Sequence, residues 1–291
     1  MNVTLDCIPC YIKQTINTLA QTEISEEKAR EIIYQTLSLF PRLDSQGTPA
    51  ENSTIVLRKV NELLGIEDPF HRAKKESNDL ALKLLPQLKE RIRQSTDPLF
   101  RSLQISVAGN IIDMGILKEF DIEGSIREAM EKNFARDDYE SFQQRLKEAR
   151  EILILGDNSG EIAFDRLLAE QLSEFGIGVT YVVKDRPILN DATMEDAVYV
   201  GMTEHIRVIS NGSGFLGTIL KDCSEEFKQA FKKADLVISK GQANYESLEA
   251  LGKEDSRLHF LLRAKCEVVA KNLGVQLGEM VFCCDAPAPC R

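Results

Sequence analysis

The chain has 291 residues, of which 43% are hydrophobic and 28% are charged, a composition typical of a globular protein with one large or two ordinary domains. Its 46 acidic residues outnumber the 36 basic ones and give a formal net charge of -10. Nucleic acids and anionic membranes would be repelled on average, so we expect neither as a partner. A small anionic substrate would need a local positive site.

The sequence also lacks the signals of export or membrane insertion. It contains no run of about 18 apolar residues, the length that a spanning helix needs. Its N-terminus, MNVTLDCIPCYIK, does not have the basic-then-apolar pattern of a signal peptide. These features predict a cytoplasmic protein, whereas the oligomeric state leaves no signature in the sequence.

Residues 1–149 carry the pattern of a helical N-terminal region. Ser25, followed by two glutamates, is typical of a helix N-cap, and Gly65 is typical of a helix end. Near the end of this region, Asn110 and Asp113 stand three apart in an apolar segment, which places them on one helix face. Buried polar groups need partners, so this pair either binds a ligand or caps neighbouring helices.

Residues 150–291 alternate between strand and helix signals, which predicts an α/β domain with a mainly parallel, doubly wound (Rossmann-like) sheet. Right-handed crossovers would place helices on both faces of that sheet. The expected strands are residues 151–155, 178–183, 206–210, 235–238, 258–262 and 278–283. The expected helices are residues 161–175, 192–200, 224–233, 244–252 and 265–273.

Polar side chains follow four of these strands. They lie in the segments GDNSGE, KDRPILND, SNGSGF and SKGQANYE. A single such segment is an ordinary turn and helix N-cap, but the ends of parallel strands meet at one edge of a sheet. We therefore expect the four segments to converge on one site. The helix N-terminus at Ser159, Gly160 and Glu161 would present unpaired N–H groups to an anion there.

The chemistry of this set indicates a metal and a phosphate. Asp157, Asn158 and Asp191 together offer oxygen ligands, which suit Mg²⁺ or Mn²⁺ better than zinc. Lys240, beside the small Gly241, can place a positive charge on a phosphate. The backbone around Asn211 and Gly212 could form a second concavity for an anion. This combination predicts phosphoryl chemistry.

Several familiar catalytic motifs are missing. The sequence has no G-x-x-x-x-G-K-[ST] phosphate loop, no G-x-G-x-x-G after a strand and no G-x-S-x-G nucleophile elbow. Its three histidines, His71, His205 and His259, are far apart in the sequence, which disfavours a histidine-based triad or an H-E-x-x-H zinc site.

The seven cysteines are an odd number clustered towards the two termini, unlike the framework of a small secreted domain. Cys7 and Cys10 form a C-x-x-C pair, a spacing used by metal and redox sites. If the termini meet, Cys283, Cys284 and Cys290 could complete a second, thiolate site. The alternative is that these cysteines are simply buried and reduced.

Six segments together give the chain a resemblance to a known family. DCIPC, AGNIID, GDNSGE, KDRPILND, SNGSGF and SKGQANYE resemble the motifs of the DUF89, or ARMT1-like, damage-control phosphatases, and more narrowly of the prokaryotic branch with an N-terminal CxxC. The resemblance runs over nearly the whole chain. It implies a helical region packed on an α/β sheet and metal-dependent hydrolysis of small phosphorylated metabolites.

The resemblance also implies roles for individual residues. The metal ligands of the family fall on Asp157, Asn158 and Asp191, and its phosphate-contacting lysine falls on Lys240. Asn110, Asp113 and Glu161 would line the pocket. The cofactor would be a divalent cation, Mn²⁺, Mg²⁺, Co²⁺ or Ni²⁺. An aspartate could attack phosphorus directly or position an attacking water, and the residues leave both routes open.

Two other function classes stay open from the sequence. One is an S-adenosylmethionine-dependent carboxyl methyltransferase, an activity also proposed within the family, although the glycine-rich loop usual for that cofactor is absent. The other is a non-catalytic protein that binds a metal and a metabolite through Asp157, Asn158 and Asp191. The substrates expected of a phosphatase are sugar phosphates, cofactor precursors or their damaged forms.

Overall fold

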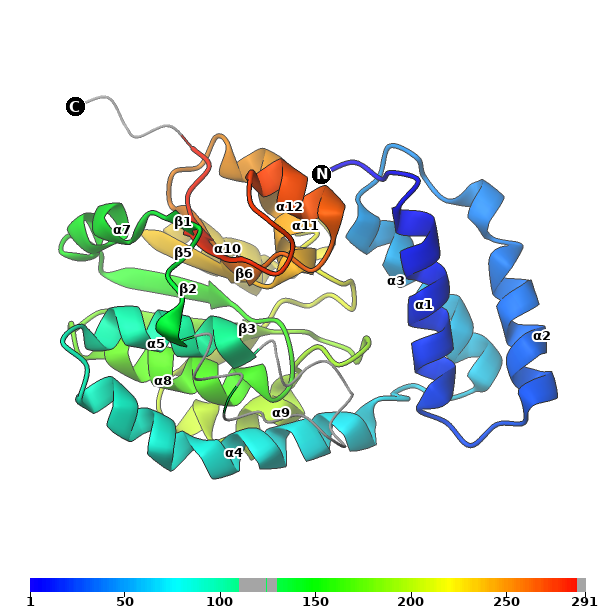
Figure 1. Cartoon of the computed structure of the whole chain (residues 1–291), viewed down its shortest axis with the longest axis horizontal. Coiled ribbons are helices and arrows are strands. Elements are labelled where there is room, and N and C mark those ends of the chain that lie inside the picture. Colours follow the sequence, from blue (N-terminus) through cyan, green and yellow to red (C-terminus); the bar gives the residue numbers. More distant parts are fainter. Residues whose placement is uncertain (110–123, 125–129, 287–291) are drawn as a thin grey trace.

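The computed structural model describes residues 1–109, 124 and 130–286. A sheet stands at the centre of the molecule with helices on both of its faces, and the helices α1, α2 and α3 project from one side (Figure 1). The strands are β1 (Arg136–Asp137), β2 (Glu151–Leu155), β3 (Gly178–Val183), β4 (Arg207–Ser210), β5 (Leu236–Lys240), β6 (Leu258–Arg263) and β7 (Met280–Cys283).

Helices make up most of the rest of the described chain. Short 3-10 turns occur at η1 (Phe40–Arg42), η3 (Met202–Glu204) and η4 (Leu220–Asp222). The α-helices are α1 (Cys7–Ala20), α2 (Glu26–Leu37), α3 (Pro49–Leu64), α4 (His71–Arg93), α5 (Pro98–Ala108), α7 (Tyr139–Leu146), α8 (Glu161–Ser173), α9 (Met194–Tyr199), α10 (Glu225–Lys233), α11 (Gln242–Gly252) and α12 (Glu267–Leu273).

The sheet confirms the predicted mainly parallel α/β architecture. Within the described residues it has seven strands in the order β1-β7-β6-β5-β2-β3-β4, and every neighbouring pair is parallel except β6 and β7. The chain runs from β2 outward through β3 to β4 and then returns to the other side of β2 with β5. The carboxyl end of β2 is therefore a topological switch point, where α/β proteins bind their ligands.

One strand lies where only helices were expected. Residues 1–149 were predicted to be all helical, but β1 lies in that region and pairs with β7. A strand of two residues is too short to show an alternating pattern, so the sequence carried no signal for it. The division of the chain at residue 149 stays a prediction. Hydrophobic residues of α4, α5 and α7 share one core with the sheet.

The two faces of the sheet have separate cores because side chains alternate along each strand. On β2, Ile152 and Ile154 face the core beneath α4, α5, α8 and α9. Leu153 and Leu155 face the opposite core beneath α10, α11 and α12. This buried strand reads as a continuous apolar run in the sequence, as expected of a parallel sheet that is covered on both faces.

The N-terminal helices form a small lobe with its own contacts. Tyr11 of α1 packs against Val56 of α3. The Ser25 hydroxyl accepts a hydrogen bond from the Lys28 amide at the start of α2, and Gly65 ends α3 with a φ of 68°, so both predicted caps are confirmed. Helix α3 also reaches the sheet region, since Leu57 packs against Ile188 in the loop after β3.

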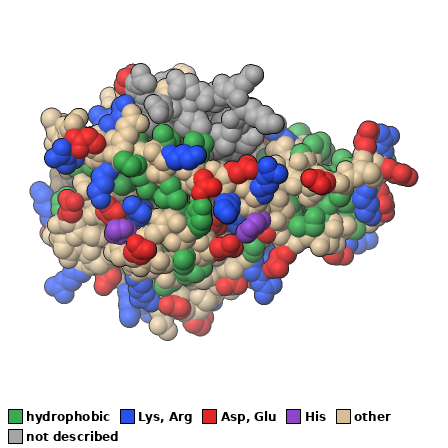
Figure 2. Space-filling model, turned by 90° about the horizontal axis from the view of Figure 1, so that it is seen from below, with side chains coloured by type: hydrophobic (Ala, Val, Ile, Leu, Met, Phe, Trp, Pro, Cys, Tyr) green, Lys and Arg blue, Asp and Glu red, His purple; other side chains and the backbone are tan. Residues whose placement is uncertain are grey.

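The surface is mixed in charge on the face that Figure 2 shows. Acidic and basic side chains are interspersed there, with small groups of apolar side chains between them. Among the residues that the structure describes, no helix combines the length and apolarity needed to cross a membrane.

Candidate active site

The polar segments predicted to converge do so at the carboxyl ends of β2, β3 and β5. The chain after β2 bonds directly to the chain before α9: the Ala192 amide donates to the Asp157 carbonyl at 2.8 Å, and the Ser159 amide donates to the Asn190 carbonyl at 2.9 Å. Asn158 and Asp191 form an isolated antiparallel bridge. The three predicted metal ligands, Asp157, Asn158 and Asp191, are thus held together by backbone hydrogen bonds.

The side chain of Asn158 organises the acidic groups around it. Its Nδ2 donates to Asp157 Oδ2 at 2.9 Å and lies 3.4 Å from Glu161 Oε2. With the amide nitrogen directed at these two carboxylates, the amide oxygen is the atom of Asn158 that could ligate a cation. All three side chains are almost fully buried.

Gly241 makes the close approach of Asp157 possible. Its backbone has a φ of 79° and a ψ of 165°, a conformation that is essentially restricted to glycine. A Cβ atom at this position would lie 1.9 Å from Asp157 Oδ2. The space that a larger residue would fill is therefore occupied by the carboxylate, and the prediction that Gly241 belongs to this site has a steric explanation.

Lys240 lies deeper than the predicted ligands, in a fully buried network of charged side chains. Its ammonium forms ion pairs with Glu161 and, at 2.6 Å, with Asp165 Oδ1, and all three side chains are fully buried. The Ser106 carbonyl lies 3.5 Å from Lys240 Nζ. These three acceptors match the three N–H donors of an ammonium group. A direct contact with phosphate, the role expected of Lys240, would require one of them to be released.

Asp165 is the centre of this network and was not among the predicted site residues. One of its oxygens accepts from the Ser106 hydroxyl at 2.5 Å, and the other accepts from Tyr181 at 2.7 Å. Its position one helical turn beyond Glu161 puts both carboxylates on one face of α8. That spacing was the available signal in the sequence.

The charges of this network depend on one another. Burial lowers the pKa of Lys240, but Asp165 and Glu161 outweigh burial, so the pKa lies above its ordinary value and the amine stays protonated. Burial raises the pKa of Glu161 above its ordinary value, an effect that Lys240 opposes and that Asp165 and Asp157 reinforce. Burial, with Asp165, also raises the pKa of Tyr181 well above its ordinary value, so its hydroxyl keeps the proton that it donates.

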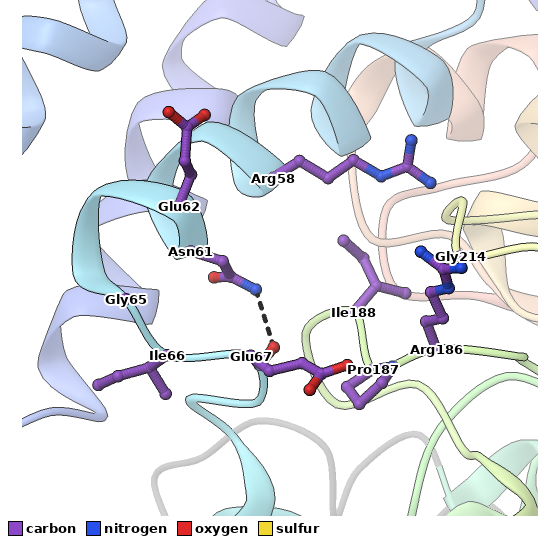
Figure 3. Close-up of a pocket in the computed structure, with 10 residues that line it drawn as sticks. All are labelled: Arg58, Asn61, Glu62, Gly65, Ile66, Glu67, Arg186, Pro187, Ile188 and Gly214. Atoms are coloured by element: carbon purple, nitrogen blue, oxygen red, sulfur yellow. Dashed lines mark hydrogen bonds between the residues drawn. The ribbon is translucent and has the colours of Figure 1, made fainter.

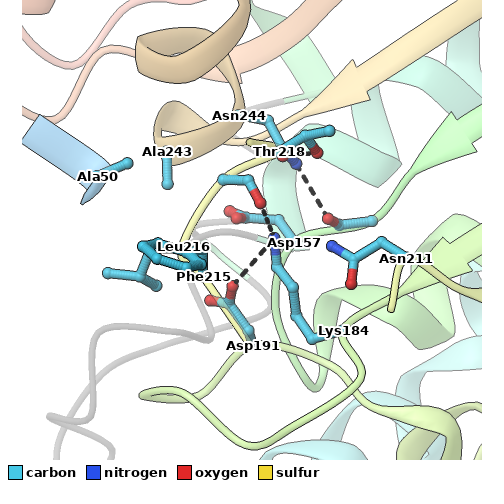
Figure 4. A network of polar contacts seen from close by, with 12 residues as sticks. Ala50, Asp157, Lys184, Asp191, Asn211, Phe215, Leu216, Thr218, Ala243 and Asn244 are labelled. Atoms are coloured by element: carbon cyan, nitrogen blue, oxygen red, sulfur yellow. Dashed lines mark hydrogen bonds and ion pairs between the residues drawn. The ribbon is translucent and has the colours of Figure 1, made fainter. Parts of the chain in front are cut away.

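A second buried lysine lies nearer to the predicted ligands. Lys184 follows β3 directly, and its ammonium lies 3.6 Å from Asp191 Oδ2 and donates to the Gly217 carbonyl (Figure 4). Its side chain is 3% exposed. The KDRPILND segment placed Lys184 near the site, but no sequence pattern favoured it over Lys240 as the neighbour of a metal ligand.

Asn244 connects the strand ends to the loop after β4. Its amide nitrogen donates to the Gly156 carbonyl at 3.1 Å and to the Lys240 carbonyl at 2.7 Å. Its amide oxygen accepts from the Thr218 hydroxyl at 2.7 Å. The ends of β2 and β5 are thus fixed to each other and to residues 211–219.

The structure gives Asn211 and Gly212 local structural roles. The Asn211 side chain accepts from the Ser213 amide at 2.8 Å, which forms a turn, and its carbonyl accepts from the Ser224 amide at 2.9 Å. Gly212 has a φ of 71°, and a Cβ there would lie 2.5 Å from Ser224 Cβ. Their predicted role in substrate binding stays a prediction.

Helix α4 supports the loop that carries Ser159 and Gly160. The Asn78 side chain accepts from the Gly160 amide at 2.7 Å and donates to Asp196 at 2.8 Å. Asp196 in turn caps α9 through Thr193. Since α4 lies in the N-terminal half of the chain, this contact links the helical region to the site, and no sequence pattern announced it.

The remaining predicted residues have different outcomes. Asn110 and Asp113 lie outside the described residues. Cys7 is buried, Cys10 is exposed, and both are free thiols. Partial burial raises the pKa of Cys10 to about 11, and Glu246, Cys266 at the start of α12 and Cys7 add to the rise. Within residues 1–109 and 130–286, no group of three or more His, Cys, Asp and Glu side chains is arranged to hold a metal. The second thiolate site stays a prediction.

The donors at the switch point fit a hard divalent cation. They comprise two carboxylates and one amide, the oxygen ligands that Mg²⁺ and Mn²⁺ prefer. Beside these donors, the Ser159 hydroxyl is buried without a hydrogen-bond partner in the described part of the chain. A buried hydroxyl of this kind suits a site that receives a polar ligand.

Comparison with known proteins agrees with this geometry. The model of the damage-control phosphatase ARMT1-like domain matches residues 3–281. The chain belongs to this family. The motifs at the strand ends had predicted it, whereas membership of the branch with an N-terminal CxxC stays a prediction.

Individual relatives span nearly the whole chain. The uncharacterized protein MJ0202 of Methanocaldococcus jannaschii is 35% identical over 95% of this chain and 93% of its own length. The damage-control phosphatase PH1575 of Pyrococcus horikoshii is 32% identical over 97% of both chains. The crystal structure of that DUF89 family protein superimposes with a TM-score of 0.89 and covers 98% of this chain and 99% of its own.

Proposed function

We propose that this protein is a metal-dependent phosphatase that hydrolyses small phosphorylated metabolites, including damaged forms of normal metabolites. Membership of the damage-control phosphatase family and relatives of that name along the whole chain support the phosphatase assignment. The substrate class is taken from the names of the family and of these relatives, whereas the metal requirement comes from the site. The observation that carries the metal requirement is the convergence of Asp157, Asn158 and Asp191 at the topological switch point of the sheet.

Each side chain of the site has a task that its contacts define. Asp157, Asn158 and Asp191 would hold the metal, which supplies positive charge to bind a phosphate oxygen and to offset charge that develops in the transition state. Lys184 keeps the Asp191 carboxylate in place through its ammonium. Glu161 orients the amide of Asn158.

Lys240 has the task of a positioning residue in this arrangement. It neutralises Glu161 and Asp165, which would otherwise repel each other and the acidic ligands above them. The network therefore fixes the N-terminal turn of α8 beneath the metal ligands. Oxygen ligands favour Mg²⁺ or Mn²⁺ over the softer Co²⁺ and Ni²⁺ as the physiological cation.

The first test is hydrolysis of 4-nitrophenyl phosphate by protein stripped of metal, with Mg²⁺, Mn²⁺, Co²⁺ or Ni²⁺ added back. We expect no turnover without metal and recovery with at least one cation. Asp157→Ala removes one ligand and should lower kcat/KM by at least about a hundredfold. Calorimetric titration with Mn²⁺ should show weakened binding to the same variant.

Asp222→Ala is the matched control, because Asp222 is an exposed aspartate in η4 with no part in the site. It should keep the turnover and Mn²⁺ affinity of the wild type. Full activity of Asp157→Ala would contradict the site. A folded wild-type protein that hydrolyses no phosphate ester with any of the four cations would contradict the proposed function and favour methyl transfer or binding alone.

A further inference from the structure

A pocket opens beside the candidate active site, between α3 and the loops that follow β3 and β4. Its volume is about 370 Å³, and Arg58, Arg186, Ile188 and Gly214 are among the residues that line it (Figure 3). Arg186 stands in the KDRPILND segment that was predicted to reach the site, whereas no motif in the sequence included Arg58. The pocket has the size of a small ligand group and contains none of the predicted metal ligands.

The two arginines converge on one point of the pocket wall. A Cβ added to Gly214 would lie 3.5 Å from an Nη atom of Arg58 and 3.2 Å from Cβ of Arg186. Both guanidinium groups lie at the Gly214 end of the pocket in Figure 3. Arg58 is held there by the ring of Phe215, whose centroid is 4.3 Å from the guanidinium carbon.

The positive charge at this end is only weakly compensated within the described residues. Arg186 has one acidic neighbour, Asp185, at 3.8 Å, and both side chains are largely exposed. No salt bridge joins Arg58 to any part of the chain that the structure describes. Of the acidic residues in the pocket wall, Glu62 is paired with Lys59 at 2.7 Å. Glu67 is the other, and its side chain lies towards Pro187 in Figure 3.

The pocket and the candidate active site share one loop. This loop begins at Lys184 and returns to Asp191, and Arg186 and Ile188 lie between them. A hydrogen bond of 3.1 Å from the Asp191 amide to the Ile188 carbonyl closes its far end. A group bound by Arg186 is thus held within a few residues of a predicted metal ligand.

Two features keep this loop rigid against α3. Leu189 has a φ of 46°, the one positive value at a non-glycine residue in the described chain, and such a conformation persists only where its surroundings impose it. Leu57 of α3 packs against Ile188 of this loop, and the Thr54 hydroxyl of α3 accepts from the Leu216 amide of the loop after β4 at 2.9 Å. The wall with Arg58 and the wall with Arg186 are therefore fixed relative to each other.

We propose that Arg58 and Arg186 bind a second anionic group of the substrate, a phosphate or a carboxylate, while the scissile phosphate occupies the metal site. This inference rests on the proposed function for the scissile group alone. A guanidinium forms paired, charge-assisted hydrogen bonds with either oxyanion, and two guanidinium groups can hold one from two sides. Substrates with an anionic group at both ends would be preferred to those with a neutral far end.

A series of sugars with one carbon chain length tests this preference. Glucose 6-phosphate has a neutral far end, 6-phosphogluconate has a carboxylate there, and glucose 1,6-bisphosphate has a phosphate. With the activating cation present, the wild type should show a higher kcat/KM for 6-phosphogluconate or glucose 1,6-bisphosphate, which have an anionic group at both ends, than for glucose 6-phosphate. The preferred member tells whether the second group is a carboxylate or a phosphate.

Arg58→Gln and Arg186→Gln should each lower that preference ratio about tenfold, the effect of losing a charge-assisted contact. Arg186→Lys should recover only part of it, because an ammonium cannot form the paired contact. Arg30→Gln is the control, since Arg30 is an exposed arginine of α2 that pairs with Glu26. It should leave the ratio unchanged.

Calorimetric titration of metal-loaded protein with the same three sugars separates this inference from the proposed function. Tighter binding of a sugar with two anionic ends, lost in Arg58→Gln and Arg186→Gln, supports the inference even if no sugar is hydrolysed. Equal ratios in the wild type and both glutamine variants, or a wild-type preference for glucose 6-phosphate in both assays, would overturn it while leaving the phosphatase proposal intact.

Discussion

The two buried lysines on either side of β2 differ in what surrounds them. Lys240, at the end of β5, is enclosed by Glu161, Asp165 and the Ser106 carbonyl and is fully buried. Lys184, after β3, has Asp191 at 3.6 Å and, among the residues that the structure describes, a single carbonyl partner, and the site lies beside it. Both are residues that the carboxyl ends of parallel strands bring to one edge, but only the second adjoins a predicted metal ligand.

This difference distinguishes a lysine that stabilises the fold from a lysine that can act on a metal ligand. A buried lysine whose three N–H groups all have acceptors stabilises the structure around it, because removing it leaves buried carboxylates without a counter-charge. A lysine with fewer partners beside a ligand can act on the charge of that ligand. We infer that Lys240, at the end of β5, stabilises the structure around the site. Lys184, after β3, lies next to the predicted metal ligands and can affect their charge.

The largest expected effect is on stability at Lys240. Lys240→Met should lower the free energy of unfolding by about 3–5 kcal/mol, because Glu161 and Asp165 stay buried without their partner. Lys184→Met leaves one carboxylate at the edge of the site and should cost about 2 kcal/mol. Urea unfolding of both variants measures the difference. Equal losses would break the distinction between the two lysines.

Gly241 tests whether a residue that follows β5 affects both the stability of the fold and metal binding. Gly241→Ala forces a Cβ against the Asp157 carboxylate in a backbone conformation that alanine avoids, so we expect a stability loss of about 3 kcal/mol together with weaker metal binding. Gly176→Ala is the control, since Gly176 also has a positive φ, 74°, but open space around it. It should cost about 1 kcal/mol and leave metal binding intact.

His259 extends the comparison of the two lysines, because within the described residues it is a buried base with no carboxylate bound to it. It lies on β6 opposite Ile238 of β5, its Nδ1 is 3.1 Å from the Arg257 carbonyl, and burial lowers its pKa from 6.5 to about 4. Between about pH 4 and pH 6.5, His259 is therefore neutral in the native state but protonated in the unfolded chain. Stability from this residue is complete above pH 6.5 and falls as the pH drops towards 4.

The variant His259→Phe should remove this pH dependence, since a second aromatic ring fits beside Phe142 and Phe282. Between pH 7 and pH 5, the wild type should lose about 2 kcal/mol more stability than the variant. Urea unfolding at both pH values measures this. An identical pH dependence would show that the native state takes up this proton as readily as the unfolded chain, so that the pKa of His259 is not lowered by folding.

The mainly parallel α/β architecture and the convergence of the three predicted metal ligands could both be predicted from the sequence alone. The apolar runs of β2 and β3 are bounded by polar turns, and a strand covered on both faces must read in this way. Asp157, Asn158 and Asp191 were predictable because parallel strands end at one edge, whatever the details of packing. Family membership followed from the same segments.

The surroundings of the two lysines and the position of the two arginines became visible only in the tertiary structure. Lys184 and Lys240 have similar contexts in the sequence, and only the packing of α8 shows which one is enclosed by carboxylates. Arg58 and Arg186 are 128 positions apart and line the same pocket because α3 packs on the loop after β3. Such contacts depend on how helices dock in three dimensions, which local periodicity does not encode.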